Sequence, residues 1–164
     1  MKAPLAALCL CLLFGCGYKS ASFYTREALG DKVFADIQVN RDDPQSAPIL
    51  IDALNRAIVA RFGKRLVSRD EADTTIEIID GSYAVSSLQK DADGFTILYR
   101  SSVAMSVVVN SPKLKNRRFR ASGDHDFAVE PSSVLSDAAK NEAAREAALK
   151  ALDMLISNLT MLGR

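Results

Sequence analysis

The chain has little of the chemistry that most enzymes and metal proteins use. His125 is its only histidine, and its three cysteines all fall within the first sixteen of 164 residues. A zinc site, which needs several ligands at helix or turn spacing, is therefore not expected. The sequence also has no G-x-S-x-G turn, Walker loop or G-x-G-x-x-G motif. These absences exclude the common nucleophile and nucleotide sites and leave a hydrolase based on paired carboxylates as an open alternative.

Neither positive nor negative charge dominates the chain. Lys and Arg together number 21 against 20 for Asp and Glu, which gives a formal net charge of +1. This balance argues against a strongly basic nucleic-acid binder and against an acidic tail. Hydrophobic residues make up 48% of the chain and charged residues 25%, an ordinary globular composition. We expect one domain with a single core that needs neither disulfide nor metal, and only local recognition of charge.

The first sixteen residues, MKAPLAALCLCLLFGC, have the features of an export signal. One lysine precedes an apolar run from Ala3 to Phe14, which is shorter than the ~20 residues of a membrane-spanning helix. A buried N-terminal helix is the alternative, but a run without a polar face would need cover on all sides. The ending LLFGC resembles a bacterial lipoprotein signal, in which Cys16 becomes the acylated first residue of the mature protein.

The cysteine positions agree with acylation. Cys9 and Cys11 would leave with residues 1–15, so Cys16 would be the one cysteine of the mature chain, without an internal disulfide. A thioether-linked lipid would remove an exposed thiol, and several acyl chains would anchor the protein durably. Gly17 after Cys16 resembles lipoproteins sorted to the outer membrane. We expect a signal at 1–15, a lipidated tether at 16–30 and one domain at 31–164, with no cofactor other than the lipid anchor.

Hydrophobic periodicity predicts the elements of the domain. Apolar residues alternate with polar ones in the strand segments and recur at helical spacing in the two helical segments. The strands are expected over 33–39, 66–67, 74–88, 95–109 and 117–129, and the helices over 47–62 and from 136 onward.

Local signals refine these elements. Ser46 is expected to be the N-cap of the first helix, and Gly63 to follow its last turn. Along the strand expected at 74–88, the apolar residues shift from even to odd positions, which predicts a β-bulge near Asp80-Gly81. Asp93-Gly94 predicts a hairpin turn in preference to a calcium loop, because the third acidic ligand and the terminal Glu of such a loop are missing. His125 shares a strand face with apolar residues, so a half-buried structural histidine is expected.

The order of elements predicts an α+β fold. We expect a two-layer sandwich with an antiparallel, mixed-edge sheet of about four strands and both helices packed on one face. The opposite face would then be available for a partner. It would carry Thr96, Arg100, Ser102 and Ser106.

The segment KLKNRRFR, residues 113–120, has five cations in eight positions. One interpretation is a solvated turn balanced by Asp124 and Asp126. The other is an anion site, because Arg forks match phosphate oxygens and Lys supplies point charge. Nucleic acid is an implausible anion for an exported neutral protein, whereas phosphorylated lipid is plausible.

Three segments together resemble one known family. CGYK at 16–19, DGFTILYR at 93–100 and SDAAKNEAAREAALKALD at 136–153 look like the lipopolysaccharide-assembly lipoproteins, the LptE family. The resemblance implies a non-enzymatic subunit of the outer-membrane lipopolysaccharide translocon, facing the periplasm and plugging the lumen of the β-barrel LptD. It further implies, by region, that basic side chains near the sheet's loops contact lipopolysaccharide phosphates. These would be Lys113, Lys115, Arg117, Arg118, Arg120 and Arg100.

Two other functions stay open. Another periplasmic adaptor lipoprotein, such as an activator of a cell-wall synthase or an accessory to a lipid transporter, would share the signal, the size and the missing active site. A periplasmic hydrolase using carboxylates is the second alternative.

Overall fold

The computed structural model describes residues 29–41, 43–131 and 133–162. The predicted signal and Cys16 lie outside the described residues, so the division at 15 and 30 stays a prediction. The elements are β1 (Lys32–Ile37), α3 (Ser46–Ala60), β2 (Arg65–Leu66), the 3-10 turn η1 (Arg69–Glu71), β3 (Thr74–Lys90), β4 (Thr96–Asn110), β5 (Arg117–Ala128) and α4 (Asp137–Leu162).

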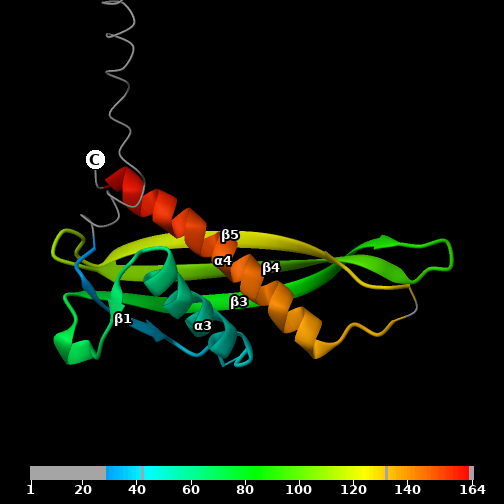
Figure 1. The fold of residues 1–164 in the computed structure, drawn as a ribbon, viewed down its shortest axis with the longest axis horizontal. Helices are drawn as coiled ribbons and strands as arrows, with labels where there is room; N and C mark the ends of the chain where they lie inside the picture. Colours follow the sequence, from blue (N-terminus) through cyan, green and yellow to red (C-terminus); the bar gives the residue numbers. More distant parts are fainter. Residues whose placement is uncertain (1–28, 42, 132, 163–164) are drawn as a thin grey trace, which may run out of the picture.

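One layer is a five-stranded sheet in the order β2-β1-β3-β4-β5, and α3 and α4 form the second layer (Figure 1). β3, β4 and β5 are antiparallel neighbours, whereas β1 runs parallel to both β2 and β3. Two parallel strands cannot be joined by a tight turn, and α3 supplies the crossover from β1 to β2. The α+β sandwich with a mixed edge is confirmed, and the fifth strand is the two-residue β2.

Two predicted irregularities of the long strands are confirmed. The register of β3 against β4 shifts between Ile78 and Asp80, which leaves Ile79 as the extra residue of a β-bulge. At the far end of this hairpin, Gly94 adopts a φ of 89°, in the left-handed region that favours glycine. The carboxylate of Asp91 accepts the backbone N–H groups of Asp93 and Phe95, at 3.1 and 2.8 Å, and so closes the turn.

The N-terminal end of α3 differs from the prediction, whereas its C-terminal end agrees with it. Ser46 is the first residue of the helix and not its N-cap, because its hydroxyl donates to the carbonyls of Asp43 (3.0 Å) and Gly81 (3.3 Å). The Ser46 hydroxyl therefore joins the start of α3 to β3 and does not accept a hydrogen bond from a helix N–H group. The stop signal is confirmed, since Gly63 has a φ of 63°.

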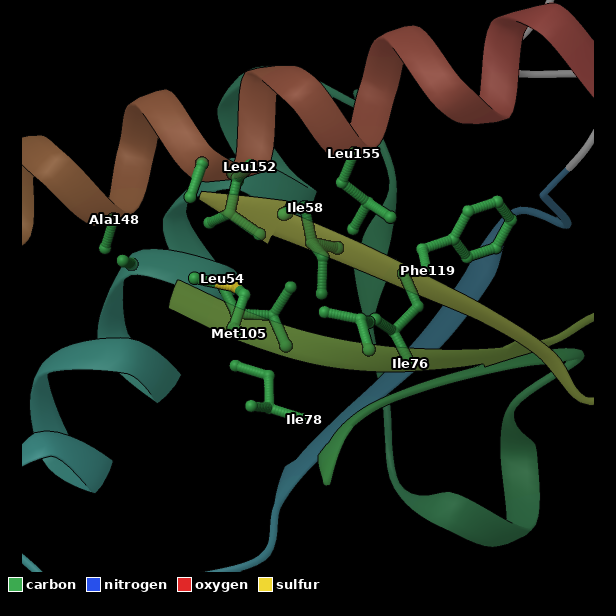
Figure 2. Close-up of a cluster of buried hydrophobic side chains, with 14 of the residues drawn as sticks. Leu54, Ile58, Ile76, Ile78, Met105, Phe119, Ala148, Leu152 and Leu155 are labelled. Atoms are coloured by element: carbon green, nitrogen blue, oxygen red, sulfur yellow. The ribbon is translucent and has the colours of Figure 1, made fainter. Parts of the chain in front are cut away.

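The core lies between the two layers. Figure 2 shows Leu54 and Ile58 of α3, Leu152 and Leu155 of α4 and Ile76 of β3 converging on it, and each is fully buried. Burying a side chain of this size contributes about 1.5–3 kcal/mol. The stripe of apolar residues predicted from helical spacing therefore does place both helices on one sheet face.

α4 approaches β5 at van der Waals limits because both surfaces carry small residues there. A Cβ built on Gly123 would lie 2.3 Å from the carbonyl oxygen of Ala147 and 2.5 Å from the backbone nitrogen of Ala151. A side chain at position 123 would thus push the helix backbone away from the sheet.

The helices cover only part of the sheet. In Figure 1 the β3–β4 hairpin extends beyond both helices. Burial follows the same division, since Ile76 and Ile78 near the start of β3 are 0% exposed whereas Leu88 near its end is 43% exposed. Neither α3 nor α4, the two helices of the described part of the chain, combines the length and the apolar character that crossing a membrane requires.

Candidate anion-binding surface

The face of the sheet turned away from α3 and α4 is uncovered in the described chain, and we call it the open face. Strand register places alternate residues of β3, β4 and β5 on it, opposite to the buried set. Ala104 and Ser122 are exposed there, whereas Met105 and Ala121, one position further along, are buried. The face expected to be available for a partner is therefore open. It includes Ser82, Ala84, Arg100, Ser102, Ala104, Ser106, Arg118, Arg120, Ser122, Asp124 and Asp126.

The turn between β4 and β5 presents its lysines outward. Leu114 is 9% exposed, and its backbone N–H donates to the hydroxyl of Ser111 while its carbonyl accepts the Ser111 N–H, at 3.0 and 2.7 Å. Because Leu114 packs inward, Lys113 and Lys115 on either side of it are exposed. Asn116 adopts a left-handed φ of 49°, a conformation that Asn tolerates better than most residues.

The structure divides the basic run into two groups. Arg117 pairs with Val109, whose side chain is buried on the helix side, whereas Arg118 and Arg120 pair with Val108 and Ser106. Side chains alternate along a strand, so Arg118 and Arg120 lie on the open face, and Arg117 lies at the end of the other face beside the turn.

Most of these cations have no partner within the described protein. Lys115, Arg117, Arg118 and Arg120 are exposed, and no ion pair or side-chain hydrogen bond joins them to another described residue. The carboxylate of Asp126 is bound elsewhere. Exposed cations without a protein partner suit both interpretations, the solvated turn and the anion site, so the choice between them stays a prediction.

Arg100 does not join the basic run. Its Nε and Nη2 donate to the two carboxylate oxygens of Asp126, at 2.7 and 2.8 Å. These hydrogen bonds, together with the opposite charge, raise the pKa of Arg100 and lower the pKa of Asp126. Arg100 and Ser106, the partner of Arg120, lie six positions apart on β4, about 20 Å at strand spacing. The structure thus separates Arg100 from the other five candidates.

A hollow of about 440 Å³ lies beside Arg120. Most of its lining surface is apolar and includes Met154 of α4. The polar groups in the lining are serine hydroxyls, the Arg120 guanidinium and the Asp80 carboxylate, of which the hydroxyls and the guanidinium can donate hydrogen bonds to an anion. Its lining is Asp80, Ser82, Ala104, Met105, Ser106, Arg120, Ala121, Ser122 and Met154.

Of the polar residues in this hollow, Arg120 was predicted as a site residue and Ser106 was placed on the face available for a partner, whereas Asp80, Ser82 and Ser122 were assigned to no site. Asp80 pairs with Ser106, and Ser82 pairs with Ala104, only because the bulge at Ile79 shifts the parity of β3. The bulge predicted from the sequence could have placed Asp80 and Ser82 on the open face. Using it for that purpose requires the register of β3 against β4, which is known only from the assembled sheet.

His125 lies on the helix-side face of β5, away from the open face. It is half-buried, and its ring lies nearly parallel to that of Phe127, at 12° with centroids 6.5 Å apart. This placement agrees with a structural histidine. Across residues 29–162, where described, no group of three or more His, Cys, Asp or Glu side chains could hold a metal ion.

These features define a class of protein: a two-layer α+β domain with a long, partly uncovered sheet and a polar open face. Within that class the chain belongs to the LptE lipopolysaccharide-assembly family, whose family model matches residues 34–159. The predicted family is confirmed. No curated protein sequence matched the chain.

Solved structures align with the chain at low sequence identity. A protein of Caulobacter crescentus described as a lipoprotein aligns with a TM-score of 0.50 and 11% identity, over 86% of this chain and 93% of that chain. Rare lipoprotein B of Shewanella oneidensis aligns with a TM-score of 0.49 and 15% identity, over 81% of this chain and 99% of that chain. At 11% identity, the Caulobacter likeness supports the fold alone.

Proposed function

We propose that this protein is the lipoprotein subunit of the outer-membrane lipopolysaccharide translocon, without catalytic activity, held within and beneath an LptD-type β-barrel. Membership of the LptE family supports the pathway. The single observation that supports the place inside a barrel is the open face of the long sheet. An uncovered face that runs the length of the sheet offers a surface against which a barrel wall could pack.

The dimensions fit a barrel lumen. β4 has 15 residues and spans about 50 Å, compared with ~30 Å for the hydrocarbon core of a bilayer. A sheet standing along the membrane normal could therefore run through the whole lumen. The lumen of an outer-membrane barrel is polar, and the open face presents serines, alanines and the Arg100–Asp126 ion pair. Charged groups of this kind suit a polar lumen and not lipid.

Lipopolysaccharide phosphates would bind mainly on the open face. Arg118 and Arg120 have no protein partner in the described chain, and the hollow, whose lining includes Ser82, Ser106 and Ser122, adjoins Arg120. Guanidinium groups bind phosphate oxygens through charge-assisted hydrogen bonds. Lys113, Lys115 and Arg117, also predicted from the sequence to contact glycolipid, lie in and beside the β4–β5 turn, away from the hollow. Arg100 would have to exchange the carboxylate of Asp126 for phosphate, so we expect a smaller contribution from it.

Anchoring would come from the N-terminus. Acylation of Cys16 would hold the protein in the periplasmic leaflet of the outer membrane. The proposed partners are the barrel, lipopolysaccharide and membrane lipid, and nucleic acid is not among them. Mass spectrometry of the purified protein tests this step directly. Residues 1–15 should be absent and fatty acids should be attached to Cys16.

Affinity purification through a C-terminal tag in mild detergent tests the partner. We expect a stoichiometric barrel larger than the lipoprotein. Ala104→Trp places a bulky ring on the open face, where Ala104 is exposed, and should reduce the yield of barrel; Ala138→Trp on exposed α4 surface is the matched control and should not. Recovery of a peptidoglycan synthase in place of the barrel would favour the adaptor alternative.

Charge reversal tests the glycolipid site. Arg118→Glu with Arg120→Glu should weaken binding to purified lipopolysaccharide by about tenfold or more, because two charge-assisted hydrogen bonds are lost. Arg41→Glu with Lys90→Glu changes the net charge equally at other exposed positions and should leave binding close to wild type. An equal loss of lipopolysaccharide binding in both double variants would mean that net charge, and not this surface, determines binding.

A further inference from the structure

The start of the domain and the β4–β5 turn lie at one end of the sheet. Register pairs Val33 with Thr74, Thr75 with Asn110, and Val109 with Arg117, so these positions form one row across four strands. Neighbouring strands are about 4.8 Å apart, so the start of β1 lies about 14 Å from the start of β5. Figure 1 shows the end of α4 on the same side.

The chain is fixed in place where it enters the domain. Leu29 is 2% exposed, and the buried Nζ of Lys64 donates to its carbonyl at 3.3 Å and to the carboxylate of Asp31 at 3.2 Å. Asp73 accepts the backbone N–H groups of Asp31 and Lys32, at 3.1 Å each. A tether from Cys16 would therefore start from a rigid point, and residues 16–28 can span at most about 45 Å.

The same end presents cations on its β4–β5 side. Lys115 and Arg117 are exposed and have no side-chain partner in the part of the chain that the structure describes. On the β1–β3 side, Asp73 accepts backbone N–H groups, and Asp31 is bonded to Lys64 while its side chain stays 90% exposed, so the positive charge is concentrated on the β4–β5 side. Met161 in the last turn of α4 is 74% exposed. Cations and an exposed apolar side chain at the same end of a molecule are a combination found at membrane interfaces.

We propose that this end of the sheet rests on the membrane that holds the acyl anchor, with Lys115 and Arg117 bound to the phosphates of anionic phospholipid headgroups. The inference depends on acylation of Cys16, which is part of the proposed function. A basic patch is the second signal that orients a lipidated protein at a membrane. This assigns Lys115 and Arg117 to phospholipid in place of the glycolipid contact predicted for them, while Arg118 and Arg120 of the open face stay available for glycolipid. The β3–β4 hairpin then points away from this membrane-facing end.

The test uses the full mature lipoprotein in lipid nanodiscs. Once Cys16 is acylated the mature sequence has no free cysteine, so Asn110→Cys and Ala92→Cys each allow a single fluorescent label, at the turn end and at the hairpin tip respectively. Nitroxide-headgroup lipid should quench the label at position 110 more than the label at 92 in discs with phosphatidylglycerol. In discs of phosphatidylcholine alone the difference should shrink.

Charge variants identify the contact. Lys115→Glu with Arg117→Glu should abolish the extra quenching at position 110, and Arg41→Glu with Lys90→Glu should retain it. Equal quenching at both labels, or an unchanged difference in phosphatidylcholine, would overturn the proposal. Quenching at 110 that appears only when lipopolysaccharide is added would assign these cations to the glycolipid and would overturn it too.

Failure of the proposed function has a different signature. A protein without fatty acid, or one that recovers no barrel, contradicts the translocon role whatever the labels report. A protein that is acylated, recovers the barrel and binds lipopolysaccharide, but shows equal quenching at both labels, contradicts only the membrane contact.

Discussion

The two halves of the β3–β4–β5 sheet have the same alternating pattern but different surroundings. Near β1, inward side chains such as Val107 and Ile78 are packed under α3 and α4 and are 0% exposed. Toward the hairpin tip, Phe95 is 50% exposed and Tyr99 is only half-buried. Alternation therefore marks a face of a strand, and the length of the covering helices decides how much of that face becomes core.

The uncovered half is held by contacts between strands. Tyr99 and Phe127 are cross-strand partners whose rings stack with centroids 5.7 Å apart. On the other face, Arg100 and Asp126 form a bidentate pair. Such pairs stabilise a sheet locally, by amounts much smaller than the burial of a core side chain.

The largest expected difference between the halves comes from removing apolar side chains. Leu152→Ala in the covered half should lower the free energy of unfolding by about 3 kcal/mol, because the side chain is fully buried and leaves a cavity. Phe95→Ala in the uncovered half should lower it by no more than about 0.5 kcal/mol. Urea unfolding followed by circular dichroism measures both. Comparable losses would show that the tip is also part of the cooperative core.

A smaller effect is expected at the closest approach of helix and sheet. Gly123→Ala should lower the free energy of unfolding by about 1–3 kcal/mol, because the new methyl group meets the backbone of α4 at Ala147 and Ala151. Ser122→Ala, one position away on the open face, is the control and should be close to neutral. A neutral Gly123→Ala would mean that α4 can move away from β5 without loss.

The smallest effect concerns the uncovered half and depends on pH. Hydrogen bonds from Arg100 lower the pKa of Asp126, so the pair stabilises the fold above the unfolded carboxyl pKa of about 3.9 and loses this contribution as pH falls through the lower folded value. The stability difference between wild type and Asp126→Asn should thus be present at pH 6 and shrink below about pH 4. Urea unfolding at a series of pH values measures it. Wild type and Asp126→Asn should differ little at any pH in an Arg100→Gln background.

Much of this architecture follows from local sequence. The apolar stripes of α3 and α4 and the alternation in the strands depend only on the periods of helix and strand. The bulge at Ile79, the turn at Asp93-Gly94 and the helix stop at Gly63 depend on backbone conformations that a few neighbouring residues determine. The basic run at 113–120 was visible as composition.

The candidate site was less predictable, because it depends on which residues become neighbours. Sequence grouped Arg100 with the basic run, but the β4–β5 register places it about 20 Å from Arg120 and opposite Asp126. The residues of the hollow meet Arg120 only after β3, β4 and β5 have paired. Ser46 bonds the carbonyl of Gly81, a contact between residues far apart in sequence that no capping rule anticipates.

The sequence by itself determined the elements, the face that each strand buries and the α+β class, because periodicity and turn chemistry are properties of short segments. Tertiary structure decided that β1 pairs in parallel with β2 and β3, that both termini of the described domain lie at the end holding the basic turn, and that the helices leave the hairpin uncovered. The physical reason is that strand partners and helix placement are chosen by packing between distant segments, whose register no local pattern encodes.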